Sequence, residues 1–196
     1  CWSLVGSEMC IRDRKNPFHP DNSPADLIKI IKSLNERGIS CPVLLRVTDY
    51  LAFRIKQINN SFFRAIREIR YKGEYKGVFP VKVNQQAQVI DRIVEFGKEF
   101  DFGLEVGSKP ELLIALAHDL SANSTIICNG IKDREFIHLA ILSIKIGFKT
   151  ILVLESPREL DLIIKISKEL DVHPLLGIRV KSVSYTHLRA HETPAN

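Results

Sequence analysis

Between residues 78 and 180, short apolar segments alternate with helical segments, and this alternation constrains the fold more than any other feature of the chain. Strand, helix and strand at this spacing are typical of parallel βαβ units, because a parallel pair needs a long crossover. The strands are apolar almost throughout, as strands covered on both faces are. The expected strands are Val78–Val83, Phe102–Val106, Thr125–Cys128, Thr150–Leu154 and Leu175–Val180.

Two architectures fit this pattern, a (β/α)8 barrel and a doubly wound sheet. No G-x-G-x-x-G or Walker A sequence follows the first strand, which counts against a nucleotide-binding doubly wound fold. We therefore predict an α/β fold with parallel strands, forming about the first half of a TIM-type (β/α)8 barrel. The expected helix starts support the alternation of strands and helices. Ser108–Glu111 and Ser156–Glu159 have the pattern of capping boxes, and Asp133 can cap the helix between them.

An N-terminal region precedes the barrel. Ser23 and Pro24 resemble a helix start, Leu27, Ile28, Ile31 and Leu34 form one apolar stripe, and Gly38 ends the helix. Val43–Val47 is expected to form a short strand. A longer helix is predicted from Thr48. The expected organisation is residues 15–47 leading into the barrel and residues 48–181 forming it.

The two ends of the chain are expected to be foreign to the protein. Leu4–Asp13 and Val183–Glu192 can be read as translations of the two strands of one DNA element, similar to the adaptor of transposase-based sequencing libraries. Such segments are set aside before the fold is considered. We therefore treat residues 1–14 and 182–196 as non-native tails, expect them to pack against nothing, and expect the remainder to be a fragment.

Composition narrows the classes of function. The net charge is +5 and the basic residues are scattered, which does not favour nucleic-acid binding. No apolar run has the roughly 20 residues that a membrane span needs. Only Cys41 and Cys128 lie outside the tails, without zinc or disulfide spacing, so a reducing cytoplasm is expected. Both are expected to pack as small apolar residues.

Lys82 is the strongest candidate for chemistry. It lies in Val78–Gln85 (VFPVKVNQ), an apolar β-branched run bounded by turn residues. Burial favours the neutral amine, the form that makes a Schiff base with an aldehyde. We predict that Lys82 lies on a strand, points into the barrel and has a largely buried amine. The alternative for an isolated lysine at a strand end is a side chain that reaches solvent.

Polar residues follow each of the five predicted strands, where a barrel carries its active site. Four of these segments together resemble the biosynthetic arginine decarboxylases, pyridoxal-phosphate enzymes built on an alanine-racemase-like barrel. The resemblance covers about Val43 to Lys181, and its motifs are FPVKVNQ, GLEVGSKPELLIALA, IICNGIKDREF and LLGIRVK.

The resemblance implies roles for individual residues. Lys82 matches the lysine that binds pyridoxal phosphate as a Schiff base. Glu105 matches an acidic catalytic position near it, although a carboxylate paired with a strand-edge lysine is an equal alternative. Arg179 resembles an arginine that binds the cofactor ring's phenolic oxygen, or it serves a structural ion pair. Glu111 is expected to belong to the capping box.

Asn129, Lys132, Asp133 and Arg134 fit the family's pattern without separate roles. The phosphate-binding loop and the ring-stacking histidine are expected beyond Lys181, so this chain alone is expected to be inactive.

The resemblance also implies a reaction, the conversion of L-arginine to agmatine and carbon dioxide in polyamine (putrescine and spermidine) biosynthesis. The complete enzyme is expected to be a cytoplasmic homo-oligomer. Magnesium is associated with the family, but the sequence contains no cluster of metal ligands. The alternatives are a related decarboxylase acting on diaminopimelate or ornithine, and a noncatalytic single-barrel protein that binds pyridoxal phosphate.

Overall fold

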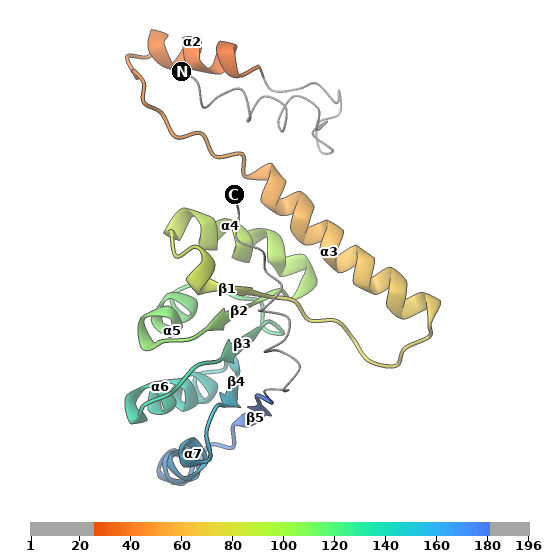
Figure 1. Cartoon of the computed structure of the whole chain (residues 1–196), viewed down its shortest axis with the longest axis vertical. Coiled ribbons are helices and arrows are strands. Elements are labelled where there is room, and N and C mark those ends of the chain that lie inside the picture. Colours follow the sequence, from red (N-terminus) through yellow and green to blue (C-terminus); the bar gives the residue numbers. More distant parts are fainter. Residues whose placement is uncertain (1–25, 181–196) are drawn as a thin grey trace, which may run out of the picture. The chain divides into compact units, whose positions relative to one another are not determined.

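The computed structural model describes residues 26–180, so both predicted tails and the Ser23-Pro24 helix start lie outside the described residues. The chain divides into two compact units between Gly73 and Glu74 (Figure 1). None of the described helices is long and apolar enough to cross a membrane.

The described part of the first unit contains the helices α2 (Leu27–Glu36) and α3 (Asp49–Glu68). Asp26 caps α2, because its carboxylate accepts the backbone N–H groups of Ile28 and Lys29. Gly38 follows α2 with a left-handed φ of +78°, as the predicted stop requires. The prediction of a strand at Val43–Val47 is wrong: this segment is exposed, has no regular secondary structure and pairs with no described strand.

The second unit is a parallel sheet whose strands follow the order β1-β2-β3-β4-β5 (Figure 1). Every neighbouring pair is parallel, so the predicted α/β fold with a partial barrel is confirmed. The strands are β1 (Val78–Pro80), β2 (Gly103–Val106), β3 (Thr125–Cys128), β4 (Lys149–Leu154) and β5 (Leu175–Ile178). The helices are α4 (Ala87–Gly97), α5 (Lys109–Leu116), α6 (Arg134–Lys145) and α7 (Pro157–Leu170), with the 3-10 turns η2 (Val81–Val83) and η3 (Lys98–Phe100).

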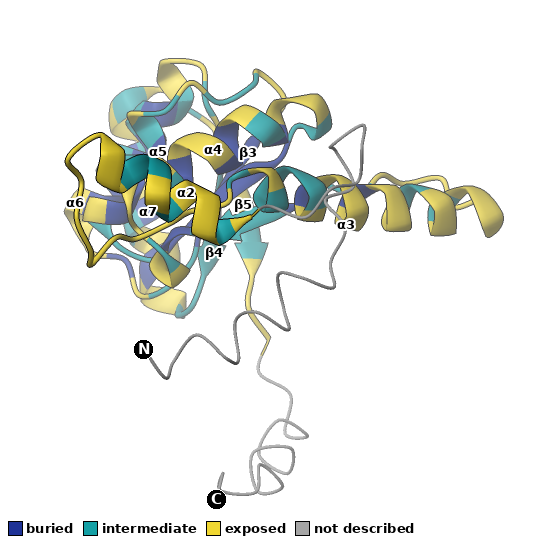
Figure 2. Cartoon of the chain, turned by 90° about the horizontal axis from the view of Figure 1, so that it is seen from above, coloured by how far each residue is buried: buried dark blue, intermediate teal, exposed yellow. Residues whose placement is uncertain are grey.

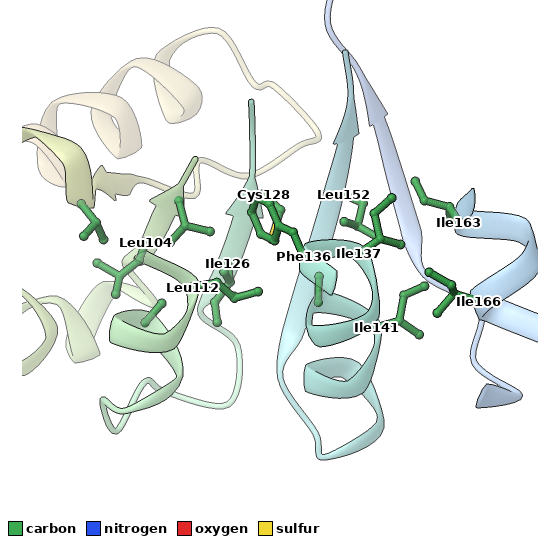
Figure 3. Close-up of a cluster of buried hydrophobic side chains, with 14 of the residues drawn as sticks. Leu104, Leu112, Ile126, Cys128, Phe136, Ile137, Ile141, Leu152, Ile163 and Ile166 are labelled. Atoms are coloured by element: carbon green, nitrogen blue, oxygen red, sulfur yellow. The ribbon is translucent and has the colours of Figure 1, made fainter. Parts of the chain in front are cut away.

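The hydrophobic core lies between the sheet and its helices (Figure 3). Side chains alternate along a strand, so Leu104 and Val106 of β2 face this core while Glu105 points to the opposite face. Each fully buried Leu or Ile contributes roughly 1.5–3 kcal/mol. The four helices α4 to α7 each combine buried residues with exposed ones, as helices that cover one face of a sheet do (Figure 2).

The helix starts depart from the predicted capping boxes. Ser108 Oγ accepts the N–H of Glu111 at 3.4 Å, but the Glu111 carboxylate accepts the N–H of Gly107 (2.6 Å) instead of that of Ser108. Ser156 makes no side-chain cap. Asp133 caps α6 as predicted, accepting the N–H of Phe136 at 2.8 Å.

Candidate functional site

The carboxyl ends of the strands carry the polar residues that the sequence singled out. Lys82 follows β1, Glu105 lies near the end of β2, Asn129 follows β3, Glu155 follows β4 and Arg179 follows β5. Because the strands are parallel and neighbours in sequence order, all five positions share one edge of the sheet.

Lys82 does not have the predicted environment. It lies in η2 rather than in a strand, and its side chain is 65% exposed, so the prediction of a buried amine on a strand is wrong. Pro80 is the last residue of β1 and cannot donate a ladder hydrogen bond. The chain turns there into η2, which buries Val81 completely and leaves Lys82 on the accessible side.

Glu105 brings three elements together. Its carboxylate is mostly buried, and its Oε1 lies 3.9 Å from Lys82 Nζ. The same oxygen accepts a hydrogen bond from Asn129 Nδ2 at 3.1 Å. The Asn129 amide therefore holds the carboxylate in place, while the longer contact to Lys82 leaves the amine freedom to move.

Arg179 belongs to a second group, which lies at the same edge of the sheet but at β4 and β5. Its Nη1 donates to Glu155 Oε1 at 3.0 Å, and the N–H of Gly130 donates to the same oxygen at 3.1 Å. Burial raises the pKa of Glu155, but the hydrogen bonds from Arg179 and Gly130 outweigh it and hold that pKa below its usual range. The ion pair that was the structural alternative for Arg179 is thus present.

The two groups meet in the loop after β3, where Asn129 belongs to the first group and Gly130 to the second. Among the ion pairs of residues 26–180, Lys82 pairs with Glu105 alone, and Arg179 pairs with Glu155 alone. Gly130 has a φ of +76°, and a Cβ there would lie 2.9 Å from the Gly107 carbonyl oxygen, so only glycine fits without strain.

Three charged residues beneath this edge were not predicted as site residues. Glu111, Lys132 and Glu159 are all buried, and each bonds to the loops that carry the site. The sequence signals were a glutamate three residues after each helix cap and a lysine inside the loop after β3. Their partners lie up to 27 residues away in sequence, so the sequence pattern alone does not connect them.

The two cysteines differ in burial. Cys41 is exposed, contrary to the prediction that it packs as an apolar residue, and Cys128 is buried as predicted. Burial raises the pKa of the Cys128 thiol to about 12, although Lys132 acts in the opposite direction, so Cys128 is an inert core residue. Within residues 26–180, no three His, Cys, Asp or Glu side chains are grouped so as to hold a metal ion.

Comparison with known protein families shows which family the chain belongs to. The family described as pyridoxal-dependent decarboxylase, pyridoxal binding domain, matches residues 55–194. The chain belongs to this family. The described part of the matched range contains all the site residues discussed above.

Curated relatives within the family are more specific. The chain is 48% identical over 165 residues to the biosynthetic arginine decarboxylase of Gloeobacter violaceus, covering 84% of this chain and 26% of that protein. It is also 48% identical over 156 residues to the enzyme of the same name from Thermosynechococcus vestitus, covering 80% and 24%. The chain thus spans about a quarter of the length of these relatives.

A solved structure agrees with the sequence relatives. The crystal structure of the biosynthetic arginine decarboxylase from Campylobacter jejuni matches with a TM-score of 0.76 and 36% identity, covering 83% of this chain and 28% of that one. The resemblance seen in the sequence motifs is therefore confirmed.

The geometry at Lys82 fits a cofactor with an aldehyde. The Lys82 side chain is 65% exposed, and its amine lies 3.9 Å from the carboxylate of Glu105, which points to the face of the sheet opposite the helices. An exposed amine that pairs with a single carboxylate, at long distance, within residues 26–180 can form a Schiff base.

Proposed function

We propose that this chain is the cofactor-binding part of a longer pyridoxal-phosphate-dependent arginine decarboxylase, which converts L-arginine to agmatine and carbon dioxide. The family match and the two curated relatives support the reaction class and the substrate. The observation that carries the proposal is the Lys82 amine on the open face of the sheet, 3.9 Å from the Glu105 carboxylate.

The residues of the site have separate roles in this proposal. Lys82 provides the amine that holds the cofactor covalently and that arginine displaces. Glu105, fixed by Asn129, holds the cation of Lys82 nearby and accepts its proton. Arg179 binds an oxygen of the cofactor ring. When bound, pyridoxal phosphate supplies an electron sink for the electron pair left behind by carbon dioxide.

The test is the substitution of Lys82 in the full-length enzyme. Lys82→Ala removes the only proposed Schiff-base amine, so decarboxylation and the visible absorbance of the lysine-bound cofactor are both lost. Lys82→Arg fails as well, because a guanidinium stays protonated. Lys149→Ala is the matched control, since Lys149 is an exposed lysine at the opposite end of a strand, and it retains both signals. Activity that survives Lys82→Ala contradicts the assignment.

The substrate is tested separately. Release of labelled carbon dioxide is compared for arginine, ornithine and diaminopimelate at equal concentrations, and arginine is expected to be preferred by the full-length enzyme. A preference for ornithine or diaminopimelate would identify the full-length protein as a related decarboxylase that acts on that amino acid. Cofactor binding without release from any of the three would make it a noncatalytic carrier.

The wider setting belongs to the same proposal. We place the reaction in polyamine biosynthesis in the cytoplasm, in a homo-oligomeric enzyme that needs neither nucleic acid nor membrane. The names of the relatives support a biosynthetic role, and free Cys41 and Cys128 are compatible with a reducing compartment. The described residues offer no fit for magnesium, so no step is assigned to a metal.

A further inference from the structure

Lys132 is a buried cation without a part in the reaction proposed above. Its side chain is fully buried, and its ammonium donates to the carbonyl oxygens of Gly130 (2.5 Å) and Val153 (2.6 Å). The third partner is the Glu159 carboxylate at 3.3 Å. Two hydrogen bonds to carbonyl oxygens and one ion pair therefore hold the ammonium in one geometry.

Glu159 uses both of its oxygens on the backbone. Oε1 accepts the N–H of Lys132 and Oε2 accepts the N–H of Glu155, each at 2.9 Å. One carboxylate at the start of α7 therefore joins the loop after β3 to the loop after β4. A neutral amide could not replace it, because its NH2 group would face one of these two donors.

The joined loops carry the groups that hold Arg179. The N–H of Glu155 is fixed by Glu159, and its carboxylate then accepts from the N–H of Gly130 and from Arg179. The carbonyl of the same Gly130 is fixed by Lys132. A continuous series of hydrogen bonds thus runs from the buried pair to an arginine that is itself 55% exposed.

We propose that Lys132 and Glu159 are positioning residues, which act through Glu155 to hold Arg179 where it meets the cofactor. The proposal rests on the cofactor-binding role proposed for Arg179. A stabilising role alone is a weak explanation of a buried pair, because apolar replacements of such pairs are often equally stable or more stable. What apolar side chains cannot supply is an acceptor for the two loop N–H groups.

The experiment measures the dissociation constant for pyridoxal phosphate in the full-length enzyme, by absorbance of the lysine-bound cofactor. Arg179→Gln and Lys132→Met each weaken binding about tenfold and shift the absorbance maximum in the same direction. In the combined variant binding is no weaker than in Arg179→Gln alone, because both changes remove one interaction. Lys165→Met, at an exposed lysine of α7, is the control and changes neither value.

A second variant separates positioning from folding. Lys132→Met with Glu159→Leu removes both buried charges but leaves the loop N–H groups of Lys132 and Glu155 without their acceptor, so the melting temperature falls while the fold persists, and cofactor binding is weakened at least as much as in Lys132→Met. Wild-type affinity and absorbance in this folded variant overturn the proposal, as do effects of Lys132→Met and Arg179→Gln that add in full.

An Arg179→Gln enzyme with unchanged affinity refutes the role of Arg179 and this proposal with it. The proposed function is not refuted by that result, because the absorbance of the cofactor bound to Lys82 is measured independently of Arg179.

Discussion

Two lysines at the same edge of the sheet, Lys82 and Lys132, differ in burial and in the number of their partners, and this difference suits one to a reaction and the other to a structural role. Lys82 has one ionic contact, at 3.9 Å, and most of its side chain is exposed. Lys132 is fully buried with three partners within 3.3 Å. An exposed pair contributes little to stability. Lys82 is therefore free to exchange partners during a reaction, whereas Lys132 is not.

A substitution of Glu105 tests whether its carboxylate takes part in the reaction. Glu105→Gln keeps an oxygen for Asn129 but removes the charge next to Lys82, so we expect the fold to persist while kcat falls at least about a hundredfold. The measurements are the rate of carbon dioxide release and the melting temperature of the full-length enzyme. Glu95→Gln, which removes a carboxylate from the exposed pair with Arg92, is the control and leaves both unchanged. A near-normal kcat in Glu105→Gln would leave Glu105 with a structural role only.

At the level of elements, the same arrangement occurs in two βα units: a buried glutamate in the first turn of the helix bonds to two loops. Glu111 at the start of α5 accepts the N–H of Gly107 and the side-chain amide of Gln85 (3.3 Å), a residue in the loop after β1. Glu159 does the same for the loops after β4 and β3. In each unit, a buried glutamate joins its own loop to the preceding one, so the edge is supported in pairs of strands.

Asp101 joins elements at the opposite edge and gives a pH-dependent prediction. A hydrogen bond from Ser121 (2.7 Å) and the ion pair with Lys76 (2.9 Å) lower the pKa of its carboxyl. A lowered pKa means stability that is present above the unfolded pKa of about 3.9 and is lost as the pH falls through the folded value. Asp101→Asn should therefore destabilise the chain by about 1 kcal/mol at neutral pH and by less in acid.

Urea unfolding at about pH 7 and about pH 3 measures this difference. Asp101 has a left-handed φ of +51°, which asparagine also tolerates, so backbone strain does not contribute. Asp171→Asn is the matched control, because Asp171 is exposed and has a φ of +54°. An equal loss at both pH values for Asp101→Asn would show that ionisation of the carboxyl is not the cause.

Prediction from sequence succeeded where the signal is local and failed where it depends on a neighbour. The five strands were found because apolar runs and turn residues are contiguous, and β3 has the predicted bounds. Val43–Val47 has the same local signal, but no strand of the described chain pairs with it. The burial of Lys82 was inferred from uninterrupted alternation, whereas the chain leaves the sheet at Pro80.

For the whole molecule, the described sheet is a partial barrel, because β1 and β5 each pair with one strand only. We expect this chain alone, incubated with pyridoxal phosphate and carboxyl-labelled arginine, to release no carbon dioxide. The chain covers only 26% of the relative from Gloeobacter violaceus, and orientation of the cofactor supplies much of the rate. Any turnover above that of free cofactor would show that these residues suffice, and the full-length enzyme is the positive control.

The two faces of β2 also give different kinds of genetic lesion. Leu104 and Val106 pack in the core, whereas Glu105 between them faces the site. Truncation of either apolar residue lowers stability, so such alleles should be temperature-sensitive and should recover in a cooler culture or beside a stabilising second mutation. An allele that loses the carboxylate should have the same low activity at every temperature, because its fold persists. Three consecutive codons would thus alternate between conditional and unconditional loss of enzyme activity.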